Sequence, residues 1–316
     1  MKAPDLVDLK EARKRLQSTL SPTPLVPAHT LIQAFGANHQ MKLENLQPTG
    51  SFKVRGAVNR LHRAEARVVT ASSGNHAAAL AWAGRRLGIE VIAYIPENTP
   101  EQKQRRLRAL GANVMIGGRG YDEVEQCAQT FAKQKGLPWI SPFSDAAIIA
   151  GSGTMALEII DQVGPPGTVL VPVGGGGLVS GLAIGLRACA PKTRIIGIQP
   201  AASCPMVVAY YARRLASVSH LPTLSDATAG GISQFTLTQV VKHVDDVIAV
   251  GEQAIADAIH HLLTEENIVV EGAGALSVAA CLCFALPKNL PEPIVHIMSG
   301  GNIDPHRLIE ILHRPL

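Results

Sequence analysis

Short apolar runs alternate with longer amphipathic runs along much of the chain. The apolar runs are rich in Val and Ile and are bounded by polar or turn-forming residues, which favours strands. The amphipathic runs that follow end at glycines and predict helices. In the second of these helices, Thr99 is the predicted N-cap and Pro100 the predicted first residue. In the first half of the chain the strands are predicted at residues 68–71, 91–95 and 113–116, and the helices at residues 77–87, 100–110 and 121–135.

The pattern resumes in the second half of the chain. Strands are predicted there at residues 169–173, 194–198 and 294–298, and helices at residues 178–188 and 252–263. An alternation of this kind is typical of parallel sheets with helices on both faces, so the sequence predicts an α/β fold with two such units. No low-complexity linker marks the boundary between them.

Composition narrows the class of protein. The chain has 316 residues, of which 47% are hydrophobic and 17% charged, so it is not a disordered chain. A net charge of only +4 and 4% aromatic residues do not indicate a nucleic-acid-binding surface. The basic run at residues 103–108 is interpreted as a solvated helix face. No stretch of 18 uninterrupted apolar residues is present, which predicts no membrane span. The five irregularly spaced cysteines are expected to be reduced and mostly buried, and the protein to be cytoplasmic.

A run of four glycines follows the strand predicted at residues 169–173 and precedes a helix. Each glycine costs backbone entropy on folding, so four together favour a role beyond a simple turn. Their use is to direct backbone N–H groups toward an anion at the positive end of the helix, which predicts phosphate binding. The run matches neither a dinucleotide fingerprint nor a P-loop. Its members are Gly174, Gly175, Gly176 and Gly177.

A lysine follows a second turn motif. Pro48, Thr49 and Gly50 predict a turn, and Ser51 is expected to cap a helix that begins near Phe52. Lys53 then lies in the first turn of that helix, where the helix dipole disfavours a cation. A lowered amine pKa suits a lysine that forms a Schiff base. Taken alone, the motif is also compatible with an ordinary exposed lysine.

Polar groups also follow two other predicted strands. Ser72, Ser73, Gly74, Asn75 and His76 come after the strand at residues 68–71, where they can bind a carboxylate or simply cap the next helix. After the last strand, the sequence has Ser299, Gly300, Gly301 and Asn302, which can line a site or form a turn.

These motifs, in this order, resemble the fold-type II family of pyridoxal-phosphate enzymes, in the branch that holds threonine and serine dehydratases and serine racemase. The resemblance covers nearly the whole chain, from Thr23 to Asn302. It implies a tryptophan synthase β-like fold of two open twisted α/β domains with the cofactor between them. Residues 1–46 and 147–316 would form the large cofactor-binding domain, and residues 47–146 the small mobile domain. It also implies a homodimer.

The resemblance implies a role for each motif. Lys53 would hold pyridoxal 5'-phosphate and move the substrate's Cα proton, with Phe52 packed beside it. Asn75 would bind the cofactor's phenolic oxygen, and Ser299 would face its pyridine nitrogen. The four glycines and Leu178 would cradle the phosphate. The substrate carboxylate would be held by Ser72, Ser73, Asn75 and His76, and Ser73 is the second acid/base in racemase-like members.

A serine opposite the pyridine nitrogen makes the ring a weaker electron sink than a carboxylate would, which favours prompt loss of a β-leaving group. We therefore expect an ammonia-lyase that converts a small β-hydroxy L-amino acid, L-threonine or L-serine first, to a 2-keto acid and ammonia. The alternatives are a serine racemase with side dehydratase activity and a dehydratase for another β-hydroxy amino acid, such as those of hydroxyectoine breakdown. His76 disfavours an enzyme of β-replacement. The intact Lys53 disfavours a binding protein that has lost catalysis.

Two places depart from the resemblance. Many members carry a divalent-cation site with a Glu and an Asp after the strand equivalent to residues 194–198, whereas this chain has Gln199 and Pro205. Hard cations prefer carboxylates, so we expect no metal site. Ala227 and the segment at residues 271–275 are more similar to dehydratases of hydroxyectoine breakdown.

Overall fold

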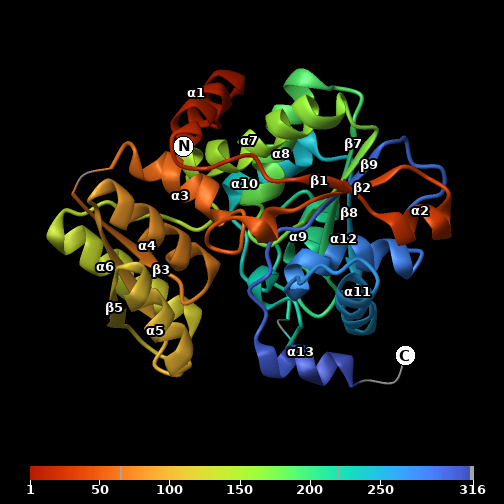
Figure 1. Cartoon of the computed structure of the whole chain (residues 1–316). Helices are drawn as coiled ribbons and strands as arrows, with labels where there is room; N and C mark the ends of the chain where they lie inside the picture. Colours follow the sequence, from red (N-terminus) through yellow and green to blue (C-terminus); the bar gives the residue numbers. More distant parts are fainter. Residues whose placement is uncertain (65, 220, 314–316) are drawn as a thin grey trace.

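The computed structural model describes residues 1–64, 66–219 and 221–313 (Figure 1). Two separate sheets organise this part of the chain. One has six strands in the order β1-β2-β9-β6-β7-β8, and the other has three strands in the order β3-β4-β5. All neighbouring strands run parallel except β1 and β2, which are antiparallel. The predicted α/β class is therefore confirmed.

The three-stranded sheet comes from the first predicted series. Its strands are β3 (Arg67–Ala71), β4 (Glu90–Ile95) and β5 (Ala112–Ile116), and its helices are α4 (Asn75–Leu87), α5 (Glu101–Leu110) and α6 (Tyr121–Lys135). The predicted start of α5 is wrong by one residue. Pro100 has ψ 137° and is itself the N-cap, so the helix begins at Glu101 and Thr99 lies outside it.

The six-stranded sheet has β6 and β9 at its centre. Its strands are β1 (Leu25–Pro27), β2 (His39–Lys42), β6 (Thr168–Pro172), β7 (Arg194–Pro200), β8 (Asp246–Val250) and β9 (Ile294–Ile297). Its larger helices are α7 (Ala146–Val163), α8 (Gly177–Cys189), α10 (Gln234–His243), α11 (Glu252–Thr264) and α12 (Gly272–Leu282). The remaining elements are α1 (Leu6–Gln17), α2 (His29–Phe35), η1 (Glu44–Leu46), α3 (Lys53–Leu61), α9 (Pro205–Ala212), η2 (Asp226–Thr228) and α13 (Pro305–Leu312).

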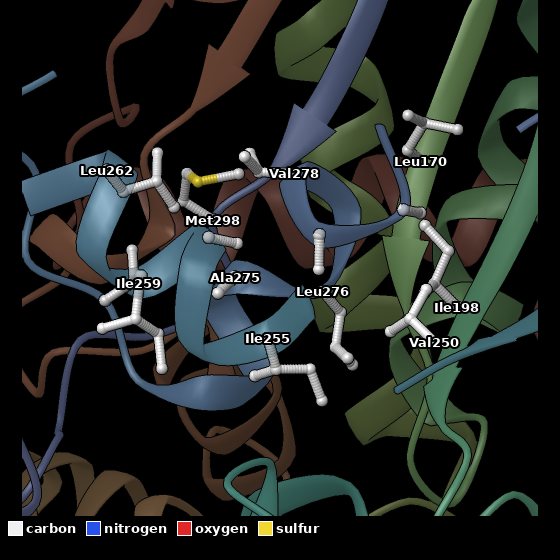
Figure 2. Close-up of a cluster of buried hydrophobic side chains, with 14 of the residues drawn as sticks. Leu170, Ile198, Val250, Ile255, Ile259, Leu262, Ala275, Leu276, Val278 and Met298 are labelled. Atoms are coloured by element: carbon white, nitrogen blue, oxygen red, sulfur yellow. The ribbon is translucent and has the colours of Figure 1, made fainter. Parts of the chain in front are cut away.

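Both faces of the six-stranded sheet are covered, because successive side chains of a strand point to opposite faces. Leu170 packs with Ile255 and Leu276 of α11 and α12 on one face, as Figure 2 shows. Val169 and Val171 pack with the residues of α8 and α10 on the other face. Burial on both faces explains why β6 is one continuous apolar run in the sequence.

Helix α7 lies at the centre of the molecule. It is long and apolar enough to cross a membrane by length and composition alone, but 67% of it is buried inside the protein. Glycines bring it close to its neighbours: a Cβ on Gly151 would lie 2.5 Å from the Arg55 oxygen of α3, and one on Gly153 would lie 2.7 Å from the Gly181 oxygen of α8. Helix α7 therefore acts as a support for α3, whose first residue is Lys53.

The cysteine prediction is partly wrong. All five thiols are free, but only Cys281 is buried, since three of the others lie on outward faces of helices or helix ends and one is half-buried. The division of the chain at residues 46 and 146 stays a prediction.

Candidate active site

One cavity of about 430 Å³ lies where the segments that follow β3, β6 and β9 meet. These segments leave the carboxyl ends of parallel strands, which is where ligands bind in open α/β sheets. Every site residue predicted from the sequence lines this cavity. They are Phe52, Lys53, Ser72, Ser73, Asn75, His76, Gly174, Gly175, Gly176, Gly177, Leu178 and Ser299.

Lys53 is the first residue of α3. Ser51 does not cap this helix as predicted: Phe52 is the N-cap, and the Ser51 hydroxyl is buried without a partner among the described residues. The Lys53 amine donates to the Pro142 carbonyl oxygen at 2.8 Å. Burial lowers the pKa of Lys53 to about 8, and the Glu271 carboxylate opposes part of this change. Desolvation rather than helix position alone thus brings the amine close to its neutral form.

The glycine loop also lines the cavity. Gly176 has φ +92°, a conformation that only glycine adopts readily, and a Cβ on Gly175 would lie 2.3 Å from the Phe143 ring. Among the described residues, no hydrogen-bond acceptor takes the N–H groups of Gly174, Gly175 or Gly176. Unpaired amides at the N-terminus of α8 fit an anionic group such as a phosphate.

Ser299 follows β9 and is 3% exposed. Its carbonyl oxygen accepts the Phe52 N–H at 3.0 Å, and Gly300 pairs with Ser51 in an isolated bridge. These backbone contacts hold the segment that carries Lys53 against the segment that carries Ser299. The two side chains come from positions 246 residues apart, yet they line the same cavity.

The loop after β3 brings hydroxyl and amide groups to the cavity. The N-cap of α4 is Gly74, so neither Ser73 nor Asn75 serves as a cap. The Ser72 hydroxyl accepts the Gly74 N–H at 3.2 Å. Burial, with a smaller contribution from nearby Lys53, lowers the pKa of His76 to about 3, so this imidazole is neutral and can bind a substrate only as a neutral group.

Four further residues line the cavity without having been assigned a role. Arg106 donates to Asn302 Oδ1 at 2.7 Å, Asn302 Nδ2 donates to Asn75 Oδ1 at 2.7 Å, and Asn75 Nδ2 donates to Glu271 Oε1 at 2.7 Å. Asp226 also lines the cavity. Burial, and after it the Asp226 carboxylate, raises the pKa of Glu271 to about 7. Arg106 is exposed, as predicted for the helix face at residues 103–108, but its side chain also reaches Asn302 at the edge of the cavity.

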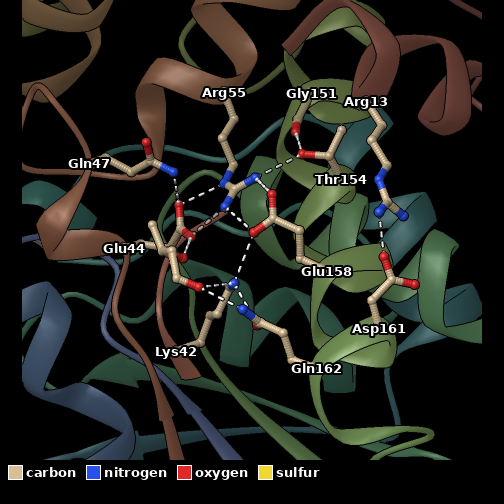
Figure 3. A network of polar contacts seen from close by, with 11 residues as sticks. Arg13, Lys42, Glu44, Gln47, Arg55, Gly151, Thr154, Glu158, Asp161 and Gln162 are labelled. Carbon is tan, nitrogen blue, oxygen red and sulfur yellow. Dashed lines mark hydrogen bonds and ion pairs between the residues drawn. The ribbon is translucent and has the colours of Figure 1, made fainter. Parts of the chain in front are cut away.

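A buried ionic network joins α3 to β2 and α7 (Figure 3). Arg55, two residues along α3, is 1% exposed and pairs with Glu44 at 2.7 Å and with Glu158 of α7 at 2.6 Å. Lys42 of β2 pairs with Glu158 at 2.8 Å and donates to the Thr23 oxygen at 2.7 Å. Two cations balance two carboxylates, so the network anchors α3 without an unpaired buried charge. In the sequence, the network is indicated only by an arginine, Arg55, two residues after Lys53.

The position that corresponds to the cation site of other family members has a different structure in this chain. The Gln199 side-chain oxygen accepts the N–H groups of Met206 and Val207 at 2.8 and 3.0 Å, and Pro205 is the first residue of α9. The amide oxygen of Gln199 thus caps α9. No cluster of three metal-ligating His, Cys, Asp or Glu side chains occurs in the described ranges.

The fold and this cavity define an α/β enzyme that holds an anionic cofactor beside a lysine amine. The chain matches the family described as "Pyridoxal-phosphate dependent enzyme" over residues 16–300. It is 38% identical to the L-threonine ammonia-lyase of Thermotoga maritima over 98% of this chain and 79% of that relative. The chain belongs to the family of pyridoxal-phosphate-dependent enzymes, and its cofactor is pyridoxal phosphate.

Solved structures of the family have the same fold. The structure of maize serine racemase superposes with a TM-score of 0.93 at 30% identity, covering 98% of this chain and 97% of that one. The threonine deaminase of Solanum lycopersicum, in its processed form, superposes with a TM-score of 0.88 at 31% identity, covering 98% of this chain and 90% of that one. The predicted fold type is therefore confirmed.

Proposed function

We propose that the protein is an ammonia-lyase that removes water and then ammonia from a small β-hydroxy L-amino acid, with L-threonine and L-serine as the first candidates. One observation carries the proposal. The cavity places a lysine whose pKa is about 8 together with a serine, rather than a carboxylate, at the end of β9. The relatives named threonine ammonia-lyase and threonine deaminase support the same activity.

The residues of the cavity fit pyridoxal phosphate. The unpaired amides of the glycine loop would hold its phosphate, with Leu178 at the start of α8 beside them. Phe52 would pack beside the ring, Ser299 would face its nitrogen and Asn75 its phenolic oxygen. When bound, the cofactor supplies the electron sink that makes the Cα–H bond of the substrate acidic.

The protein's own groups then carry out the proton transfer. Ser72, Ser73, Asn75 and His76 would hold the substrate carboxylate, which places the Cα–H bond toward Lys53. The neutral Lys53 amine would take the Cα proton and return it to the β-hydroxyl, which would then leave as water. The enamine that is released gains water and loses ammonia, which gives the 2-keto acid.

The second candidate is a serine racemase with side dehydratase activity, favoured by one observation. Ser73 lines the same cavity as Lys53 and would act as an acid/base on the other face of the substrate. Elimination is the stronger candidate because the Gln199 oxygen caps α9 where racemase-like members bind a cation. A dehydratase for a larger β-hydroxy amino acid remains the third candidate.

The wider organisation follows the family resemblance. We propose that residues 47–146 form a small domain that closes over the substrate against residues 1–46 and 147–316. We also propose a cytoplasmic homodimer that works without a metal ion and binds neither nucleic acid nor membrane.

Keto-acid formation tests the proposed function. Purified protein reconstituted with pyridoxal phosphate would be given L-threonine, L-serine and bulkier β-hydroxy amino acids separately, each with EDTA. We expect keto acid from one of these substrates. Lys53→Ala should abolish its formation, whereas Lys135→Ala, on the exposed face of α6, should not. No keto acid from any of them, or equal rates for Lys53→Ala and wild type, would contradict the proposal.

A further inference from the structure

Four cavity-lining residues from four separate segments form one chain of hydrogen bonds. Arg106 lies on α5, Asn75 is the first residue of α4, Asn302 follows β9, and Glu271 is the N-cap of α12. We call this chain the amide relay. Its three bonds, Arg106 to Asn302, Asn302 to Asn75 and Asn75 to Glu271, each measure 2.7 Å.

The relay has a fixed direction. A guanidinium can only donate hydrogen bonds, and the Glu271 carboxylate, once ionised above its pKa of about 7, can only accept them. Because Arg106 donates at one end, the side-chain oxygen of Asn302 must face it and the NH2 group must face Asn75. Asn75 must in turn direct its oxygen to Asn302 and its NH2 group to Glu271. Neither amide can flip without facing two donors or two acceptors.

The relay leaves one donor of Asn75 for the cavity. An amide NH2 group has two N–H bonds, and that of Asn75 gives one to Glu271. No described residue accepts the other. The orientation fixed by the relay therefore keeps an N–H donor, rather than the amide oxygen, available to a bound molecule.

Backbone packing holds both ends of the relay in place. The Thr49 oxygen accepts from Asn302 Nδ2 at 2.9 Å and from Arg106 at 3.2 Å. Gly50 has φ +72°, and a Cβ there would lie 2.5 Å from Asn302 Oδ1. A Cβ on Gly300 would lie 2.5 Å from Glu271 Oε1. Any side chain at these two glycines would therefore displace the relay.

The relay also connects the two sheets. Arg106 and Asn75 belong to helices of the three-stranded sheet, whereas Asn302 and Glu271 belong to segments attached to the six-stranded sheet. Arg106 is exposed at the rim, and its bond to Asn302 is solvent-accessible. This bond can open when the two sheets move apart without burying an unpaired charge.

We propose that Arg106 is a positioning residue for the reaction: by donating to Asn302 when the two sheets approach, it fixes the Asn75 amide with an N–H toward the bound cofactor. The proposal rests on the proposed function for the role of Asn75. Its new content is that a rim arginine on α5, which need not touch substrate or cofactor, sets the orientation of that amide.

Arg106→Met tests the proposal because it removes the donors and keeps an unbranched side chain at the exposed rim. Arg106→Lys restores one charged donor. Arg105→Met is the matched control, since Arg105 is the preceding residue of α5 and, among the residues that the structure describes, pairs only with Glu101 at 3.1 Å. Asn302→Asp places an acceptor opposite Asn75 Oδ1 and reverses the relay. In metal sites, loss of a residue that orients a ligand typically costs about 10- to 100-fold in activity, and we expect a loss of similar order here.

Two readouts accompany the rates. In the holoenzyme, Arg106→Met is expected to lower kcat about tenfold with little change in KM, and to shift the absorption band of the bound cofactor and its pH dependence. In the cofactor-free protein, it is expected to speed amide hydrogen exchange in residues 47–52 and 299–303. Arg106→Lys should restore both properties in part, and Arg105→Met should leave both unchanged.

The outcomes separate the two proposals. If the wild type is active and Arg106→Met has the same kcat, spectrum and exchange rate as the wild type, the proposed role of Arg106 is overturned. The proposal of an ammonia-lyase is then unaffected. A wild type inactive on every substrate tested would overturn the proposed function, while spectrum and exchange would still test the relay. If Asn302→Asp does not fold, Arg106→Met at the exposed rim decides.

Discussion

The backbone N–H of Phe52 donates to the carbonyl oxygen of Ser299 at 3.0 Å. This hydrogen bond joins the residue before Lys53 to the residue at the end of β9, so the lysine and the serine hydroxyl are held at a fixed separation by main chain rather than by mobile side chains. Helix α3, which begins at Lys53, is held from a second side because it packs closely on Gly151 of α7. A rigid base close to the cofactor's ring is what proton abstraction from Cα requires.

The buried ionic network gives the first prediction. Arg55→Met leaves Glu44 and Glu158 in the protein interior with one cation, Lys42, which pairs with Glu158. Removing one partner of a buried ionic group typically costs about 3–5 kcal/mol. Urea unfolding of the cofactor-free protein should show a loss of that size. Arg13→Met, which breaks an exposed pair with Asp161, should cost at most about 1 kcal/mol. Equal losses in the two variants would show that the network does not stabilise α3.

The glycine loop gives the second prediction. A Cβ at Gly175 would overlap the Phe143 ring at 2.3 Å, so Gly175→Ala must displace the ring or the loop. Overpacking of this kind costs about 1–3 kcal/mol. Titration of the apoprotein with pyridoxal phosphate should then show a dissociation constant raised about 5- to 100-fold. Gly120→Ala, at a position with open space around it, should bind the cofactor as the wild type does. Unchanged binding by Gly175→Ala would remove the loop from the cofactor site.

Ser299 gives the third prediction. Ser299→Asp would place a carboxylate where we propose that the pyridine nitrogen lies, which stabilises the protonated ring and strengthens the electron sink. A longer-lived carbanion should then exchange its Cα proton with solvent more often before the β-hydroxyl leaves. In deuterated buffer, the ratio of Cα exchange to keto acid should rise in Ser299→Asp and not in Ser299→Thr. The same ratio in both variants would exclude Ser299 as the partner of the ring.

Glu271 gives the fourth prediction, which concerns pH. Burial raises the pKa of this carboxyl to about 7, so between pH 4.5 and 7 the folded apoprotein binds more protons here than the unfolded chain does. Its contribution to stability is present below pH 4.5 and is lost as the pH rises through about 7. The free energy of unfolding should therefore fall over this interval by up to about 3 kcal/mol more in the wild type than in Glu271→Gln.

The matched control for this prediction is Glu265→Gln, at an exposed position at the end of α11. Its unfolding free energy should follow the wild type between pH 4.5 and 7. A Glu271→Gln curve parallel to that of the wild type would mean that Glu271 titrates normally and that the cavity does not desolvate it.

Much of the fold could be predicted because buried parallel strands are continuous apolar runs. Strand β6, buried on both faces, is the clearest case. Strand β2 was not predicted, because it buries His39 and Lys42, whose polar groups are paired with His296 and Glu158 far along the chain. Pairing at such sequence distances has no local signal.

The site divides in the same way. Lys53 and the glycine loop were predicted from short motifs whose residue types suit one chemistry. The contact of Arg106 with the site was not predicted, because an arginine on an exposed helix face has the same pattern whether it contacts water alone or also Asn302, which lies 196 positions away. The Ser51 cap failed for another reason: the helix begins at Lys53, which makes Phe52 the N-cap.

The most direct test of the account is a proton NMR time course in deuterated buffer with EDTA, with the reconstituted enzyme and L-threonine or L-serine. The account predicts loss of the substrate's Cα-proton signal together with the appearance of 2-keto acid, and neither change with Lys53→Ala. Loss of the Cα-proton signal without keto acid would contradict elimination and establish proton abstraction alone, as in a racemase.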